Sequence, residues 1–126
     1  MPTPTAEATW RDPWLGRADV SVFLCGRIDE RKEGCAGGPV TAARRDAIRA
    51  TLESFPEIRE IFHESPRQAH ETLVRLSPEK ARKIPPEYMP DSFRVKLKDP
   101  SWFSDNLAGL RGTSGVSLVI DLRSPR

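Results

Sequence analysis

The chain has 126 residues, of which 37% are hydrophobic and 30% charged, so it is long enough for one domain with a modest core. Its 20 basic and 18 acidic residues are interspersed and leave a net charge of +2, which argues against a nucleic-acid-binding surface. No apolar run approaches the roughly 18 residues that span a bilayer, and the N-terminus lacks the apolar segment of a signal peptide. We therefore expect a soluble domain, either excised from a larger membrane or secreted protein or standing alone.

The N-terminal 18 residues contain three prolines and two tryptophans but no apolar periodicity. This composition predicts a flexible tail over residues 1–18 that Trp10 and Trp14 hold against the rest of the chain. The remainder, residues 19–126, is predicted to form one domain.

A strand and an amphipathic helix open the predicted domain. The strand covers residues 19–25 and places alternate residues on one face, namely Val20, Val22 and Leu24. Beyond a polar loop, Thr41 can cap a helix that Pro56 ends. Its apolar stripe is made by Ala43, Ala47, Ile48, Thr51, Leu52 and Phe55. Residues 57–64 are then predicted to form a second, less regular strand.

The next segment, residues 66–91, is predicted to form a small helical lobe. Ser65 and Gln68 have the spacing of a capping box, and Pro66 stands between them at the first helical position. We expect this helix to reach about Leu76, with Ala69, Leu73 and Leu76 facing inward. A second helix start at Ser77-Pro78 predicts a short helix over residues 79–83, and the proline-rich link IPPEYMPD follows it.

The clearest strand pattern comes after the lobe. Phe93, Val95 and Leu97 alternate with Arg94 and Lys96, which predicts a half-buried strand with the two basic side chains outward. Asp99-Pro100 can start a helix whose inward residues are Phe103, Leu107 and Leu110. The last strand, VSLVIDL, is expected to face the core through Leu118 and Ile120. This order of elements predicts an α+β fold of the ferredoxin-like βαββαβ type, with the lobe inserted between strands 2 and 3.

The only two cysteines, Cys25 and Cys35, lie at the ends of a polar loop after the first strand. A metal site would need further ligands, and only His63 and His70 are available, at no recognised spacing. A redox dithiol would favour a short Cys-x-x-Cys pair, which is absent. Two unpaired thiols are a further alternative. A structural disulfide is favoured because the loop has few apolar side chains to order it, and disulfides persist outside the cytosol.

The sequence carries no recognisable motif for catalysis or for a cofactor. The segment GCAGG is not followed by Lys-Ser or Lys-Thr, so it does not indicate a phosphate-binding loop. Neither histidine has a serine or cysteine nucleophile motif beside it, and both are interpreted as solvated or locally satisfied. We therefore predict a protein that is not an enzyme, with no catalytic residue, no metal and no cofactor.

Several apolar residues are left over once the core has been assigned. The lobe is too small to bury all of Leu76, Ile84, Tyr88 and Met89, and Trp102 points away from its inward neighbour Phe103. These side chains either close the lobe by packing together or form an exposed apolar surface for a partner protein. We predict the second arrangement, in which at least two of the four lobe residues are exposed and form an apolar groove.

Several segments match a known family in their order and spacing. A strand ending VFLC is followed about ten residues later by a second cysteine, then by VTxxxRxAI…LxxxPEI and S-x-x-x-A. The match continues through MPDSFRVKLKDP and ends in GVSLVID. Together these segments, over about residues 19–122, resemble the extracellular domain of the cell-division permease FtsX in its actinobacterial form.

The resemblance implies a non-catalytic role on the extracellular face of the cell membrane. FtsX forms an ABC transporter complex with the ATPase FtsE through transmembrane helices that are absent from this sequence. Its outer domain signals to peptidoglycan hydrolases or their adaptors at the septum, and the resemblance implies that the lobe binds a coiled-coil helix of that partner. The alternative is a small secreted or periplasmic ligand-binding domain of ferredoxin-like fold that is unrelated to division. No nucleic-acid partner is expected.

Overall fold

The computed structural model describes residues 14, 17–26, 34–99, 107 and 109–122. Their helices and strands, in chain order, are β1 (Val20–Leu24), α2 (Ala42–Glu53), β2 (Ile58–Glu64), α3 (Pro66–Leu76), α4 (Pro78–Lys83), the 3-10 helix η1 (Pro86–Tyr88), β3 (Ser92–Leu97) and β4 (Val116–Asp121). The helix predicted after Asp99 falls largely outside the described residues, as do Trp102 and Phe103, and of that segment Leu107 is helical.

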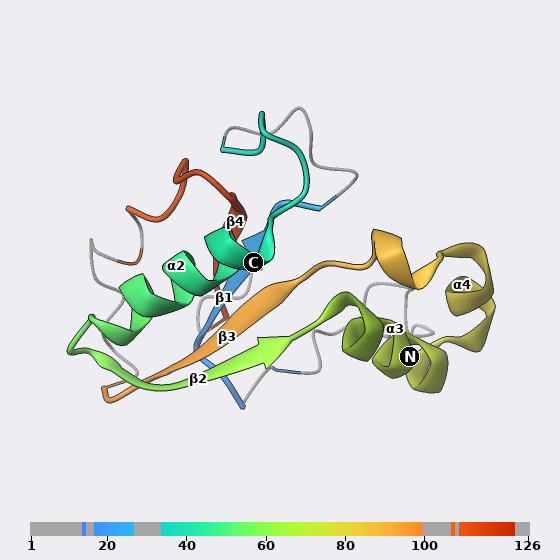
Figure 1. Ribbon diagram of the computed structural model, residues 1–126. Coiled ribbons are helices and arrows are strands. Elements are labelled where there is room, and N and C mark those ends of the chain that lie inside the picture. Colours follow the sequence, from blue (N-terminus) through green and yellow to red (C-terminus); the bar gives the residue numbers. More distant parts are fainter. Residues whose placement is uncertain (1–13, 15–16, 27–33, 100–106, 108, 123–126) are drawn as a thin grey trace.

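One antiparallel sheet organises these elements, in the strand order β2-β3-β1-β4. This is the order expected of a ferredoxin-like sheet, and it confirms the predicted fold class. Helix α2 lies across one face of the sheet, which we call the core face (Figure 1). Helices α3, α4 and η1 form the lobe, which extends beyond the ends of β2 and β3 on the right of Figure 1. The sheet and α2 together are called the body.

The core lies between α2 and the core face, as the alternating sequence pattern predicts. Strands β1 and β3 contribute every second residue because successive side chains point to opposite faces. The buried residues of this cluster are Val20, Val22, Leu24, Ile48, Leu52, Phe93, Val95, Leu97, Leu107, Leu110, Val116 and Val119. Burying this much apolar surface is the main favourable contribution to folding.

Strand β4 differs from the prediction in the face that it presents. Leu118 and Ile120 were expected in the core, but they are 43% and 38% exposed, whereas Val116 and Val119 are buried. The reason is a register shift between β1 and β4. Phe23 pairs with Leu118, but the next residue, Leu24, pairs with Val116, so one residue of β4 is skipped between the two pairs. Because side chains alternate along a strand, one extra residue exchanges the two faces beyond it.

Helix α2 begins and ends close to where the sequence predicts, but its buried stripe is narrower. Thr41 caps it, since its hydroxyl accepts a hydrogen bond of 3.1 Å from the backbone N–H of Arg44. Only Ile48 and Leu52 are buried and Phe55 is half-buried, whereas the flanking positions Ala43, Ala47 and Thr51 are exposed. Ile48, Leu52 and Phe55 are four and three residues apart, so they lie on one side of the helix and contact the sheet. The small residues on either side of this stripe remain exposed to water.

Cys25 and Cys35 form a disulfide, as predicted, and both cysteines are buried. The loop end beside Cys35 docks onto the turn before β4, where the carbonyl of Gly34 accepts a hydrogen bond of 2.8 Å from the N–H of Gly115. Gly34 has a φ of +84°, and a Cβ atom there would lie 2.6 Å from the carbonyl oxygen of Thr113. Only glycine tolerates both this conformation and this close approach.

The lobe begins with the predicted capping box. The hydroxyl of Ser65 accepts from the N–H of Gln68, and the Gln68 side-chain oxygen accepts from the N–H of Ser65. Inside the lobe, His70 Nε2 donates to the carbonyl of Ala81 over 3.1 Å and thereby links α3 to α4, so this histidine is locally satisfied. Ala69 and Leu73 are buried as expected. Leu76 was expected to face inward but is 54% exposed, since it is the last residue of a helix in a lobe too small to cover it.

Candidate functional site

A groove with a largely apolar lining opens on the lobe. It has a volume of about 560 Å³ and is lined by Leu73, Lys83, Ile84, Pro85, Tyr88, Met89 and Pro90. Leu73 is buried and belongs to α3, whereas the other lining residues come from the end of α4, from η1 and from the prolines that flank η1. The groove therefore lies where the proline-rich link crosses α3.

Prolines give the link its shape. Pro85 is extended and Pro86 begins η1, whose short turn is closed by hydrogen bonds from the N–H of Tyr88 to Pro85 and from the N–H of Met89 to Pro86, each 3.0 Å long. Proline restricts its own φ and favours an extended conformation for the residue before it. A link with so few accessible conformations can hold apolar side chains at a surface without a large core beneath them.

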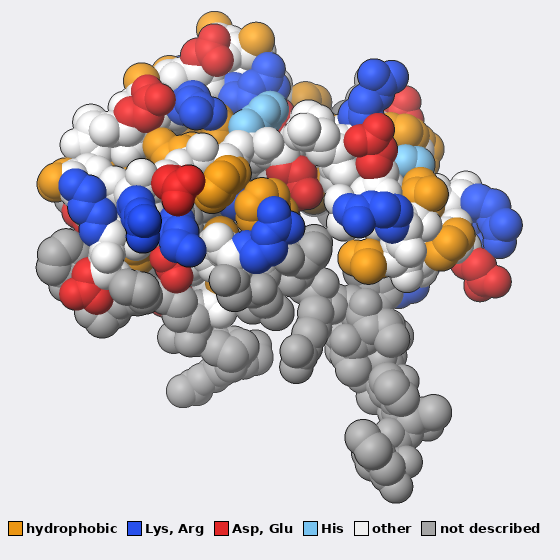
Figure 2. Space-filling view, turned by 90° about the horizontal axis from the view of Figure 1, so that it is seen from below, with side chains coloured by type: hydrophobic (Ala, Val, Ile, Leu, Met, Phe, Trp, Pro, Cys, Tyr) orange, Lys and Arg blue, Asp and Glu red, His pale blue; other side chains and the backbone are white. Residues whose placement is uncertain are grey.

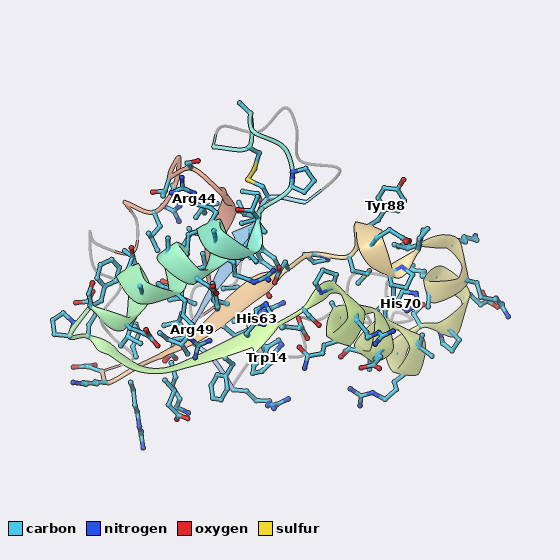
Figure 3. The ribbon with its side chains drawn as sticks, viewed as in Figure 1. Trp14, Arg44, Arg49, His63, His70 and Tyr88 are labelled. Atoms are coloured by element: carbon cyan, nitrogen blue, oxygen red, sulfur yellow. A yellow bond between two sulfur atoms is a disulfide. The ribbon has the colours of Figure 1, made fainter. Side chains whose placement is uncertain are left out.

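The structure brings three of the five predicted contact residues together in this groove. Tyr88 is 42% exposed and projects outward from the lobe (Figure 3), whereas Ile84 and Met89 are half-buried. Leu76 is exposed on the lobe but is not a lining residue, and Trp102 lies outside the described residues. Four further lining residues, Leu73, Lys83, Pro85 and Pro90, are not among the contact residues predicted from the sequence. Leu73 was assigned to the inside of the lobe, and the other three are not large apolar side chains that the core pattern leaves over.

The lobe joins the body at two places, which we call the base of the lobe: Glu64-Ser65 on entry and Asp91-Ser92 on exit. On the core face, the buried carboxylate of Asp91 accepts from Arg45 Nη1 at 2.7 Å and from His63 Nε2 at 2.6 Å. Arg45 belongs to α2 and His63 to β2, so this cluster fastens the exit of the lobe to both. His63 was interpreted as solvated or locally satisfied, and it is satisfied by Asp91.

The opposite face of the sheet, which we call the outer face, carries a second polar cluster at the base of the lobe. Arg94 was expected to point into solvent, but only 4% of it is exposed. Its guanidinium donates to Glu64 Oε1 at 3.0 Å, to the hydroxyl of Ser21 at 2.9 Å and to the hydroxyl of Ser92 at 3.0 Å. It is buried because these partners satisfy its charge and because the aromatic ring of Phe23 lies 4.9 Å from it.

No three His, Cys, Asp or Glu side chains in the described part of the chain are grouped so as to hold a metal ion. Acidic and basic side chains are interspersed over the visible faces of both the body and the lobe, without a large field of one sign (Figure 2). Of the helices in the described ranges, none combines the length and the apolar character that crossing a bilayer requires.

Comparison with known proteins agrees with this architecture. A family model described as "FtsX extracellular domain" matches residues 17–124, and no curated protein sequence matches significantly. Among solved structures, the chain is similar to the crystal structure of extracellular domain 1 of FtsX from S. pneumoniae in complex with undecyl-maltoside. That likeness has a TM-score of 0.60 at 17% identity and covers 82% of this chain and 93% of that chain, and at this identity it shows the shared fold. The family match extends over most of the chain, so the chain belongs to the FtsX extracellular domain family, the non-catalytic outer part of a permease subunit of a cell-division transporter.

Proposed function

We propose that this domain binds a peptidoglycan hydrolase or its adaptor through the groove of the lobe and activates it at the division septum. The observation that carries the proposal is the groove itself, which gathers Ile84, Tyr88 and Met89 at the surface of a domain whose core is already complete. Family membership supports the setting, which is the extracellular face of a cell-division transporter.

The lining of the groove suits the apolar face of a helix. Tyrosine and methionine are favoured at binding surfaces, since tyrosine offers a rigid ring and methionine adapts its shape to the partner. Lys83 adds a positive charge at the groove, which fits an acidic residue beside the apolar stripe of the partner helix. The S. pneumoniae structure of this fold contains undecyl-maltoside, an amphiphile with an alkyl chain, and this supports an apolar binding surface on the fold.

In this proposal the domain contributes no chemical step. The ATPase FtsE would act on it through the membrane part of the transporter, and the lobe would present the groove to the hydrolase. Both connections of the lobe are held by polar clusters, so a displacement at the body can reach the groove through strands β2 and β3.

Replacing Tyr88 and Met89 together by alanine should weaken binding of the partner helix about tenfold or more, since each buried apolar side chain contributes roughly 1.5–3 kcal/mol. Folding should be nearly unaffected, because Tyr88 is exposed and Met89 only half-buried. The measurements are calorimetric binding of the hydrolase coiled coil and a thermal melt of the same variant. Leu118→Ala is the matched control, since it removes an exposed apolar side chain from the body.

A collapsed melt of the double variant would show that these residues belong to the core, and the groove would then not be a docking surface. If binding and melting both keep their wild-type values, the partner docks elsewhere on the domain. In that case Trp102, the fifth residue predicted from the sequence, is the next position to test.

A further inference from the structure

Trp14 covers the ion pair between Arg94 and Glu64 on the outer face of the sheet. Its indole Nε1 donates to Glu64 Oε2 over 3.3 Å, and its ring lies 5.5 Å from the ring of Phe62 and 5.8 Å from the guanidinium of Arg94. One oxygen of the buried Glu64 carboxylate thus binds Arg94 of the body, and the other binds Trp14, which precedes the first strand.

Glu64 lies at the point where the chain enters the lobe, so its contact with Trp14 acts on the base of the lobe. Glu64 is the last residue of β2, and the next residue, Ser65, caps the first helix of the lobe. The partner of Glu64, Arg94, also holds Ser92, the first residue after the lobe. One guanidinium therefore binds the strand that enters the lobe and the strand that leaves it.

Asp19, the residue before β1, is also hydrogen-bonded to the sheet. Asp19 donates its N–H to the carbonyl of Val95 over 2.8 Å, and its carboxylate accepts from the N–H of Leu97 over 2.8 Å. This attachment lies at the end of β3 away from the lobe, whereas Trp14 lies beside Glu64 at the lobe end. Trp14 and Asp19, which both precede β1, thus contact the sheet near opposite ends of β3.

We propose that Trp14 is a positioning residue that fastens the base of the lobe to the body, so that displacing its indole from Glu64 loosens the lobe relative to the body. The cluster of Trp14, Glu64 and Arg94 is called the Trp14 clamp. This inference concerns motion within the domain and does not depend on the identity of the partner.

The energetics of buried ion pairs explain why the clamp acts locally. A pair of opposite charges that is removed from water is stable only while its remaining hydrogen-bonding positions are filled. Without Trp14, Glu64 Oε2 loses the indole N–H as a donor and the pair becomes open to water at the point where β2 becomes α3. The core lies on the other face of the sheet, so Val22, Leu52 and Phe93 keep their contacts.

Trp14→Ala in the full chain tests the clamp, and two observables separate loosening of the lobe from loss of the fold. Amide hydrogen exchange at the end of β2 and the start of α3 should become faster by about tenfold, whereas exchange in α2 should stay unchanged, because sub-global opening is local. Spin labels on Glu53→Cys in α2 and Arg82→Cys in α4 should show a broader distance distribution in the Trp14→Ala background than with Trp14 present.

Two further variants are matched to this one. Trp14→Phe keeps a ring against Phe62 but has no N–H for Glu64, so its exchange should be intermediate. Arg17→Ala removes the cation that lies over the Trp14 ring without touching Glu64 and should behave as wild type. The proposal is overturned if Trp14→Ala leaves exchange and label distances unchanged. It is equally overturned if exchange in α2 and at the base of the lobe accelerates by the same factor, because Trp14 would then stabilise the whole fold.

Discussion

Replacing Arg94 by methionine is expected to lower the free energy of unfolding by about 3–5 kcal/mol, the cost of leaving one member of a buried ion pair without its partner. Glu64 is buried, and in the variant it would keep the hydrogen bond from Trp14 but lose its countercharge. The hydroxyl groups of Ser21 and Ser92 would lose their donor as well. Urea denaturation followed by circular dichroism measures the change, with an unaltered m-value indicating an effect on stability alone.

The neighbouring lysine on the same strand provides the control. Lys96 faces the same side of the sheet but is half-buried, so Lys96→Met should change stability by no more than about 0.5 kcal/mol. A double variant in which Arg94 and Glu64 become methionine and leucine should recover much of the loss, since apolar residues can replace a buried pair. If Arg94→Met costs no more than Lys96→Met, the guanidinium is not buried in the native protein.

Removing the disulfide by a Cys25→Ala, Cys35→Ala double substitution should destabilise the domain by about 3 kcal/mol. The two cysteines are separated by ten positions, and opening a loop of that size returns chain entropy to the unfolded state. The wild-type protein unfolded with a reducing agent should show a similar loss, whereas the double variant should not respond to the reductant.

The covalent state can be checked independently by mass. Alkylation under denaturing conditions should add two labels only after reduction, because the described residues contain no free cysteine. Two thiols that react without any reductant would contradict the disulfide and remove the argument that the domain works outside the cytosol.

Local features of this chain could be predicted because each depends on residues close together in sequence. The capping box of Ser65 and Gln68 and the cap at Thr41 use hydrogen bonds within a single turn, and both are confirmed. The alternation of Phe93, Val95 and Leu97 identified the core face of β3 for the same reason. The proline-rich link also located the lobe, since prolines limit the backbone whatever surrounds them.

Features that depend on contacts between residues far apart in the chain could not be predicted from the sequence. Leu118 and Ile120 turn away from the core because an extra residue of β4 enters the pairing with β1, and alternation along β4 gives no sign of where that residue falls. Arg94 is buried because Glu64, 30 positions earlier, and Ser21, 73 positions earlier, meet it on the outer face. The alternation along a strand predicts on which face of the sheet each side chain lies. It does not predict which other residues cover that face.

The same division applies to the candidate site. The sequence by itself placed Ile84, Tyr88 and Met89 outside the core, because a short lobe cannot bury them. The tertiary structure alone decided that they meet Leu73 in one groove and that Trp14 reaches the base of the lobe. Apolar content and spacing are properties of a segment, whereas the groove depends on how the proline-rich link packs against α3 within the lobe. The clamp depends on contacts among Trp14, Glu64 and Arg94, which are far apart in the chain and meet only once the sheet has formed.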